Sequence, residues 1–448
     1  MGVYSKVFKG FYANIPACAG MTALCAVLVL LTTTPAAEGG QMVSPAKGNN
    51  CQLPKGKMTL SEAMEIGLCR NLDTKAAYEN VQAAKFQKYQ AYSGYLPSVS
   101  GTTTRNWRYG SSGQEFIPGS GAGLSASWLL FDFGRRESDL SSAVATWNAA
   151  GFDYNSVIQT FVYDLISAYY NCLMVQADER ANSELVKVAE TAFNAASTKF
   201  KAGSVPKADV LRAETQLAQK KVDWQKSEVN VKIANAKLLA MLAFDTSQKL
   251  SLDDTAGEAV LAEQDVESLI DQAKNLRPDY KAAKENLKSA EYKLYSSYLR
   301  NLPSVSLNAN KDWDLYADTS FSTISVRVSM PLFAGFANLN AARQAAAQRD
   351  QAEFREKAKG ISVEREVWDA FHNYNTAVAV LESTKTLLKS AKESERVVAG
   401  MYKAGRATML DWLTAQSELA SAERQAIYAK YDVLVKKYAL SLSIGEIG

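Results

Sequence analysis

Histidine is nearly absent from this chain, because only one of the 448 residues, His372, is a histidine. A chain with a single imidazole lacks most of the side chains that usually serve as general bases and zinc ligands. The sequence also contains no clustered nucleophile, base or metal ligands, so we predict no catalytic residue, no metal site and no cofactor. His372 follows Phe371 in an apolar helical pattern, which favours a packing or wall residue.

Long apolar runs are missing beyond the N-terminus. Lys6 and Lys9 precede an apolar stretch at residues 17–31 and the small residues 34–37, a pattern typical of a secretory signal. We predict a signal peptide at residues 1–37. The alternative is a retained anchor, although the apolar stretch is shorter than the ~20 residues of a spanning helix. No later segment has ~18 consecutive apolar residues, so we predict no transmembrane helix in the mature chain.

Cysteine is scarce, and the charge is almost balanced. Of the five cysteines, two fall in the predicted signal peptide. In an oxidising export compartment we expect Cys51 and Cys69 to form a disulfide that pins the N-terminal segment, the alternative being two free thiols. Cys172 is expected to be a small packing residue. The net charge of +3, with no basic run, gives no reason to expect nucleic acid as a partner.

The chain does contain two copies of one unit. Lys201-Ala-Gly203 recurs as Lys403-Ala-Gly405, and Leu130-Phe131 recurs as Leu332-Phe333, in both cases 202 positions later. A constant offset over this length indicates an internal duplication. The predicted segments are an extended leader at residues 38–58, a first repeat at 59–245, a connecting loop at 246–265 and a second repeat at 266–448.

Each repeat contains a pair of strands with one apolar and one polar face. Ile324, Val326 and Val328, for example, alternate with polar residues. The glycine-rich stretch 119–123 joins two such strands and opens no helix, so we interpret it as a hairpin loop and not as a phosphate-binding loop. The predicted strands cover about residues 98–107, 123–131, 304–313 and 321–332. Aromatic residues that fit interfacial belts lie near strand ends: Trp107, Tyr109, Trp128 and Trp313.

Very long helices follow the strand pairs. Residues 134–200 contain no proline, nor do residues 338–402, and at 1.5 Å rise per residue each helix would be about 100 Å long. Apolar residues of the second helix follow steps of three and four, which predicts a coiled-coil seam. This seam comprises Val367, Phe371, Tyr374, Val378, Leu381 and Leu388. Further helices are predicted at about residues 59–95 (with a break near residues 69–71), 206–244, 266–299 and 408–443.

The amphipathic strands require a closed arrangement if they cross a bilayer, because an open sheet edge leaves backbone groups unpaired. One chain offers four strands, two chains eight and three chains twelve. Twelve strands leave a lumen that eight would fill with side chains. The predicted fold class is a mixed α and β membrane protein: a trimeric twelve-stranded β-barrel, continued by a long α-helical coiled-coil tunnel and built from two internal repeats. The alternative is a soluble β-layer with one buried face.

These residues together resemble the TolC-like outer-membrane factors, the outer membrane efflux protein family. The resemblance is carried by 95–99 and 302–305 before the strands, 130–134 and 331–335 after them, and the hairpin segments 200–203, 209–211, 402–405 and 411–413. It implies a homotrimer in the outer membrane of a Gram-negative bacterium that spans into the periplasm. It also implies that the tunnel end docks onto a periplasmic adaptor (membrane fusion) protein of an inner-membrane pump of the ABC or RND type.

The two hairpin turns form the tunnel tip in this family. Gly203 and Gly405 are suitable for ending a helix, since glycine accepts a positive φ. From the resemblance we expect the adaptor to contact the two glycines together with Ser204, Ala407 and Thr408.

Four charged or aromatic tip residues are candidates for gating. The family resemblance places Asp411 in a carboxylate ring at the tunnel entrance, and Asp209 in the matching turn. Both aspartates also fit a local role in the first turn of a helix. Thr414 stands where the family has a second aspartate, so any selectivity should be weaker. Tyr402 and Arg406 are expected to latch the resting tip through hydrogen bonds, the alternative being that Arg406 is an exposed turn residue.

The predicted function is that of a passive exit duct, in contact with outer-membrane lipid, for a tripartite export system. Its cargo would be polypeptide, as in type I secretion, or drugs and other small molecules; the leader with Cys51 and Cys69 slightly favours polypeptide by resemblance. A self-sufficient porin would need more strands per chain and no long helices. A structural or adhesive coiled-coil envelope protein without a transport role would account for the helices but not for the strand pairs.

Overall fold

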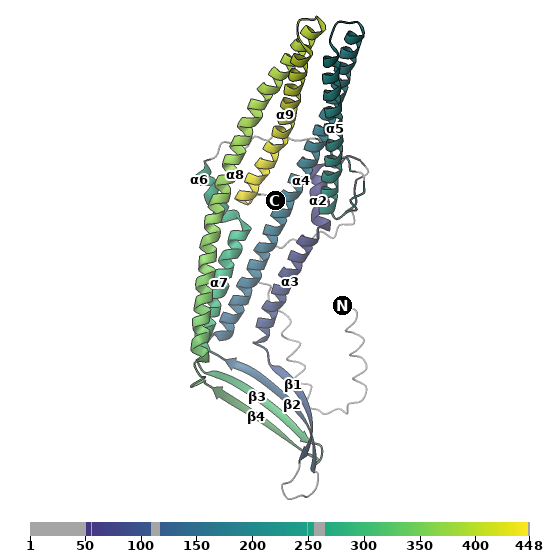
Figure 1. The fold of residues 1–448 in the computed structure, drawn as a ribbon. Coiled ribbons are helices and arrows are strands. Elements are labelled where there is room, and N and C mark those ends of the chain that lie inside the picture. Colours follow the sequence, from purple (N-terminus) through teal and green to yellow (C-terminus); the bar gives the residue numbers. More distant parts are fainter. Residues whose placement is uncertain (1–50, 55, 109–116, 249, 255–264, 447–448) are drawn as a thin grey trace. The chain divides into compact units, whose positions relative to one another are not determined.

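A computed structural model of the chain describes residues 51–54, 56–108, 117–248, 250–254 and 265–446 (Figure 1). The predicted signal peptide at residues 1–37 lies outside the described residues. So do Tyr109, most of the predicted leader and residues 255–264 of the predicted connecting loop.

The same order of elements occurs twice: two helices, two strands and two further helices. The first set is α2 (Leu60–Arg70), α3 (Leu72–Ser93), β1 (Ser98–Arg108), β2 (Ile117–Phe131), α4 (Arg135–Lys201) and α5 (Lys207–Met241). The second set is α6 (Val266–Leu276), α7 (Pro278–Leu299), β3 (Ser304–Asp314), β4 (Thr319–Ser329), α8 (Ala337–Lys403) and α9 (Met409–Ile444). The duplication predicted from the sequence is therefore present in the fold.

The short helices begin and end where their cap residues dictate. At the start of α2, the backbone N–H of Glu62 donates to Thr59 Oγ1 and the N–H of Thr59 donates to the Glu62 carboxylate, over 3.3 and 2.8 Å. The predicted helix at 266–299 is wrong as a single helix, since the chain breaks at Arg277 with ψ 123°. The following Pro278 disfavours a helical backbone at the preceding residue.

The strands form one antiparallel sheet in the order β1-β2-β3-β4. Opposed residues share a face, and the pairs Leu307 with Val326 and Val305 with Val328 keep one face apolar. Strand β2 begins at Ile117, so the glycine-rich stretch 119–123 lies within the strand and its prediction as a hairpin loop is wrong. Strand β4 ends at Ser329 and not at residue 332. Pro331 explains the early end of β4, because it has no backbone N–H to donate to a strand ladder.

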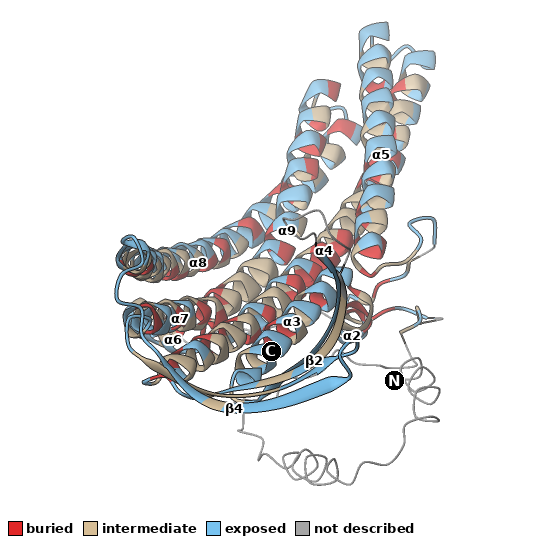
Figure 2. Ribbon diagram, turned by 90° about the horizontal axis from the view of Figure 1, so that it is seen from below, coloured by how far each residue is buried: buried red, intermediate tan, exposed pale blue. Residues whose placement is uncertain are grey.

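Neither face of the sheet is covered within the described part of the chain. Among these residues the strands pack on one another, and β4 is exposed along almost its whole length (Figure 2). The exposed apolar residues include Leu124, Ile324, Val326 and Val328. A soluble β-layer would bury this face under helices, and the described elements supply no such cover.

Two long helices dominate the helical part. Helices α4 and α8 each contain 67 residues, so each hairpin turn lies about 100 Å along its helix from the strand before it (Figure 1). Next to the sheet, α4 packs between α3 and α7, and α7 also packs on α8. Toward the turns, α5 packs on α4, α4 on α9, and α9 on α8. None of the described helices has the length and hydropathy needed to cross a bilayer.

The predicted seam of α8 is half-buried or buried at each of its positions, including Val367, Tyr374 and Leu381. The largest core cluster joins α2, α4, α5 and α9 around Leu165 and Leu238.

The segment before α2 is attached to that helix by a disulfide between Cys51 and Cys69, whose Cα atoms are 6.3 Å apart.

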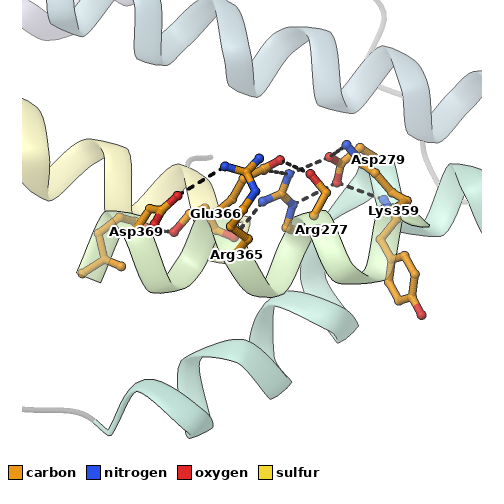
Figure 3. A network of polar contacts seen from close by, with 10 residues as sticks. Arg277, Asp279, Lys359, Arg365, Glu366 and Asp369 are labelled. Atoms are coloured by element: carbon orange, nitrogen blue, oxygen red, sulfur yellow. Dashed lines mark hydrogen bonds and ion pairs between the residues drawn. The ribbon is translucent and has the colours of Figure 1, made fainter. Parts of the chain in front are cut away.

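An ion-pair network around the buried Arg277 joins helices of the second repeat (Figure 3). Arg277 lies 2.7 Å from Asp279 and 2.6 Å from Glu366, and Lys359 lies 2.7 Å from Asp279. Arg277 also donates to the backbone oxygen of Ser443 at the end of α9 over 3.3 Å. Burial raises the pKa of Asp279, but its hydrogen bonds to the two cations outweigh burial and lower the pKa to about 2. We assign this network a structural role because its charges are already paired.

Candidate functional site

The two hairpin turns have the same backbone geometry. Gly203 and Gly405 each have φ 71°, the left-handed region that glycine adopts without strain. In the first turn the N–H of Ser204 donates to the Lys199 carbonyl over 2.9 Å. In the second, the N–H of Arg406 donates to the Met401 carbonyl over 2.8 Å. The repeated Lys-Ala-Gly motif therefore encodes one helix-ending turn used twice.

The helices after the turns begin differently. In α9 a capping box joins Thr408 and Asp411: the Asp411 carboxylate accepts from the Thr408 N–H over 2.8 Å, and Thr408 Oγ1 accepts from the Asp411 N–H over 3.2 Å. The side-chain and backbone hydrogen bonds from Thr408 lower the pKa of the exposed Asp411. In α5 the cap position is Pro206, which offers no side-chain hydrogen bond. Asp209 instead forms a loose ion pair with Arg212, 3.5 Å long.

Tyr402 is the buried centre of the tip. Its ring stacks on Trp412, with the ring centroids 5.0 Å apart. Lys199 of the other hairpin places its Nζ 4.1 Å from the centroid of the Tyr402 ring and donates to the Tyr402 carbonyl over 2.7 Å. Trp412 Nε1 donates to Glu395 over 3.0 Å. Lys199 thus connects the first hairpin to an aromatic pair of the second.

The hydroxyl of Tyr402 is buried and has no hydrogen-bond partner in the part of the chain that is described. Burial, followed by the nearby charge of Asp209, raises the pKa of Tyr402. Arg406 is exposed, and the described residues form no hydrogen bond between it and Tyr402. An unsatisfied buried hydroxyl costs about 1–3 kcal/mol, so this position would gain from a polar neighbour.

The other predicted contact residues lie at the surface of the turns. Gly203, Ser204, Gly405 and Thr408 are exposed, and Ala407 is half-buried. Three residues around Tyr402 were not predicted: Lys199, which joins the two hairpins, and Trp412 and Glu395, which are hydrogen-bonded within the second hairpin. Comparison of the two repeats gives a signal for Lys199 and Trp412, because the equivalent positions in the other repeat hold Met401 and Val210. Among the described residues no group of histidine, cysteine and acidic side chains could hold a metal ion.

The duplicated strand pairs, the uncovered apolar sheet and the two long hairpins define a channel subunit of the bacterial outer membrane. The chain belongs to the Outer membrane efflux protein family, which matches residues 64–243 and 269–446. The protein is therefore a non-enzymatic outer-membrane channel of tripartite export systems, extending into the periplasm. The predicted family, the fold of two repeats with four strands per chain, the channel function and the outer-membrane location are confirmed.

Individual relatives are distant in sequence but similar along most of their length. Protein CyaE of Bordetella pertussis is 24% identical over 431 residues, covering 93% of this chain and 90% of the relative. Outer membrane protein TolC of Vibrio cholerae is 23% identical over 388 residues, covering 83% and 85%. The solved structure of the outer-membrane channel OprN is 20% identical and has a TM-score of 0.79 over 86% of this chain and 90% of that one.

Proposed function

We propose that three copies of this chain close a twelve-stranded barrel and a helical tunnel through which substrate passes to the exterior. The single observation that carries this proposal is the sheet with two open edges: β1 pairs with β2 and β4 pairs with β3, and no further strand pairing is seen among the described residues. In a bilayer both edges must be paired with another strand. Three four-stranded sheets would do so and leave a water-filled lumen.

The two faces of the sheet suit lipid on one side and water on the other. The apolar face contains exposed valine, isoleucine and leucine side chains, which would be favourable against acyl chains. On the opposite face Ser100 and Ser125 are hydrogen-bonded across the strands over 2.8 Å, and Ser127 donates to Asn308 over 2.9 Å. Such a surface is compatible with a hydrated lumen.

Substrate would enter at the hairpin turns, where a periplasmic adaptor protein would dock. The exposed residues Gly203, Ser204, Gly405 and Thr408 would contribute to that contact. The channel would be passive, and an ABC or RND-type inner-membrane pump would supply both the energy and the choice between polypeptide and small-molecule cargo. No wall residue needs chemistry for this role.

The resting tip would be held shut by contacts around Tyr402. Within one chain Lys199 already fixes this residue. Arg406 is exposed, and in a trimer it would be available to a neighbouring subunit. Three copies of Asp411 around a narrow entrance would attract cations, and the threonine at 414 would limit the strength of that effect.

The proposal is tested by the native mass of the purified protein and by its conductance in planar lipid bilayers. A trimer that produces stable single channels is expected. A detergent-free, water-soluble monomer without conductance would refute the duct. For the latch, Tyr402→Phe and Arg406→Ala are compared with the wild type, and unchanged conductance in both variants would exclude these two residues from gating.

A further inference from the structure

The strands of the two repeats carry the same arrangement of a cation and a tryptophan. Arg105 and Trp107 of β1 correspond to Lys311 and Trp313 of β3, 206 positions later. The guanidinium carbon of Arg105 lies 5.7 Å from the centroid of the Trp107 ring, and Lys311 Nζ lies 5.4 Å from that of Trp313. Within ~6 Å a cation is attracted by the face of such a ring. Each half of the chain therefore contains one cation–tryptophan pair.

Both pairs lie on the apolar face of the sheet. The register places Lys311 opposite Leu124 of β2, and Arg105 opposite Ser120 of the same strand. Because opposed residues share a face and successive residues alternate, the odd-numbered residues of β1 and β3 belong to one face. These residues are Val99, Gly101, Thr103, Arg105, Trp107, Val305, Leu307, Ala309, Lys311 and Trp313.

The charged residues of this face are all positive at the strand positions that the structure describes. Arg105 and Lys311 are exposed, and neither forms an ion pair with another described residue. The acidic residues of β3, Asp312 and Asp314, fall on the opposite face. Asp314 also accepts a hydrogen bond from the backbone N–H of Tyr316 in the following turn over 2.9 Å. The two cations therefore have no anionic neighbour among the described residues of their own face.

A second copy of the chain supplies no acidic strand residue either. In the proposed trimer the strand beside β1 is β4 of the next copy. On this face β4 carries only uncharged residues, which are Ser320, Ser322, Ile324, Val326 and Val328. The described strands thus leave both cations available to a negatively charged partner.

The position of the cations along the strands indicates their depth in the membrane. From the helix end outward, β3 presents Val305 and Leu307, then Lys311 and Trp313, and the turn to β4 follows. The helices leave the sheet at the other end and extend into the periplasm, so the turn lies toward the exterior (Figure 1). A cation on a lipid-facing strand is costly at the middle of a bilayer and tolerated near its surface. The repeated order in β1 therefore places Arg105, like Lys311, near the headgroups of the outer leaflet.

We propose that Arg105 and Lys311, each with its tryptophan, bind the phosphate groups of lipopolysaccharide, the glycolipid of the outer leaflet. The inference rests on the proposed barrel, which directs this face toward lipid. A guanidinium or ammonium group binds phosphate through charge-assisted hydrogen bonds. The tryptophan beside it offers an apolar ring and one N–H donor at the boundary between acyl chains and headgroups.

The two pairs form separate sites. Arg105 and Lys311 stand opposite positions four residues apart on β2, and β1 and β3 are separated by two strand spacings. With about 3.4 Å per residue and about 4.8 Å between strands, their Cα atoms are about 17 Å apart. A single phosphate group cannot bridge this distance. Each chain therefore offers two sites, and three chains offer them at regular intervals around the barrel.

Titration of the purified protein in mild detergent tests the inference. The probes are fluorescently labelled rough-type lipopolysaccharide, the same glycolipid after chemical removal of its phosphates, and phosphatidylglycerol. The variant R105Q/K311Q is expected to bind intact lipopolysaccharide about five-fold or more weakly than the wild type, because it loses the charge-assisted bonds to phosphate. Removal of the phosphates should weaken binding to the wild type by a similar factor and should leave binding to the variant unchanged.

Two control variants separate the sites from a general effect of charge. R105K/K311R keeps both cations and should bind within about two-fold of the wild type. R327Q removes a cation of β4 that stands opposite Ser306, on the other face, and should also stay within about two-fold. If R105Q/K311Q fails to assemble, R105Q and K311Q are measured singly, and each should halve the number of glycolipids bound per trimer.

Wild-type affinity in R105Q/K311Q, or an equal loss in R327Q, would overturn the inference. Phosphatidylglycerol that binds as tightly as lipopolysaccharide, with the same loss in R105Q/K311Q, would reveal a site for any anionic lipid and overturn the assignment to the outer-leaflet glycolipid. A native mass of a monomer would refute the proposed barrel together with the sites. A conducting trimer whose glycolipid binding is unchanged in R105Q/K311Q would refute the sites alone.

Discussion

Replacement of Lys199 by methionine should weaken the closed tip. Lys199 is the residue of the first hairpin that holds Tyr402 of the second, through a hydrogen bond of 2.7 Å to its carbonyl and a contact of 4.1 Å with its ring. Methionine removes the charge and the donor but keeps an unbranched side chain. It is also the residue found at the equivalent position, Met401.

The size of the effect follows from these two contacts. A hydrogen bond from a charged group contributes about 1.5–3 kcal/mol, and a cation over an aromatic ring about 0.5–1 kcal/mol at a partly exposed site. The new contact between the methionine sulfur and the Tyr402 ring contributes about 0.3–1.5 kcal/mol of stabilisation and offsets part of this loss. The net loss is about 2 kcal/mol per subunit, which corresponds to roughly a 30-fold shift of the closed–open equilibrium toward open.

The measurement is single-channel conductance and open fraction in planar bilayers. Lys199→Met should increase one or both, and Lys201→Met is the control because Lys201 lies on the same hairpin and is exposed. Identical conductance and open fraction in wild type, Lys199→Met and Lys201→Met would refute the role of Lys199. An equal increase in both variants would show a general effect of removing positive charge at the tip.

Three further predictions concern the ion-pair network and the cap of α9. Arg277→Met should lower the free energy of unfolding by about 1–3 kcal/mol in denaturant titrations, because the half-buried Glu366 loses its ion-pair partner and Asp279 keeps only Lys359; Lys274→Met, at a half-exposed pair, should change it by about 1 kcal/mol or less. The pKa of Asp279 is lowered in the folded state, so its stabilisation is present above the ordinary value of 3.8 and is lost as the pH falls through about 2. Wild-type stability should therefore fall more steeply than that of Asp279→Asn across this range in thermal unfolding, and parallel curves would contradict the assignment. Asp411→Ala and Thr408→Ala both remove the capping box, at about 0.5–2 kcal/mol, but Asp411→Ala alone should reduce cation selectivity in ion-substitution recordings; equal selectivity in the two variants would restrict Asp411 to the cap.

Local sequence patterns predicted most elements of this fold. Alternation of apolar and polar residues located β1 and β3 to within one residue, since that pattern is set by the two faces of the sheet. The absence of proline likewise predicted α4 and α8. The break at Arg277 was not predicted, because it depends on a single residue, Pro278, which disfavours a helical backbone at the position before it.

The tip was predicted only in part. The turns and the capping residues Thr408 and Asp411 depend on neighbours three residues away, so the sequence contains their full pattern. The contact of Lys199 with Tyr402 joins residues about two hundred positions apart, and no local pattern encodes it. Comparison of the two repeats would have drawn attention to Lys199, since its counterpart carries no charge.

Helices α4 and α8 have identical lengths of 67 residues. This equality limits which insertions and deletions the protein can tolerate. Deleting one residue from α4 alone would pull its turn back by about 1.5 Å and rotate everything beyond the deletion by about 100°. Such a deletion would carry seam residues into water while the other hairpin stayed in place. Length changes in one half should therefore survive only when matched in the other, or when confined to connecting segments outside the long helices.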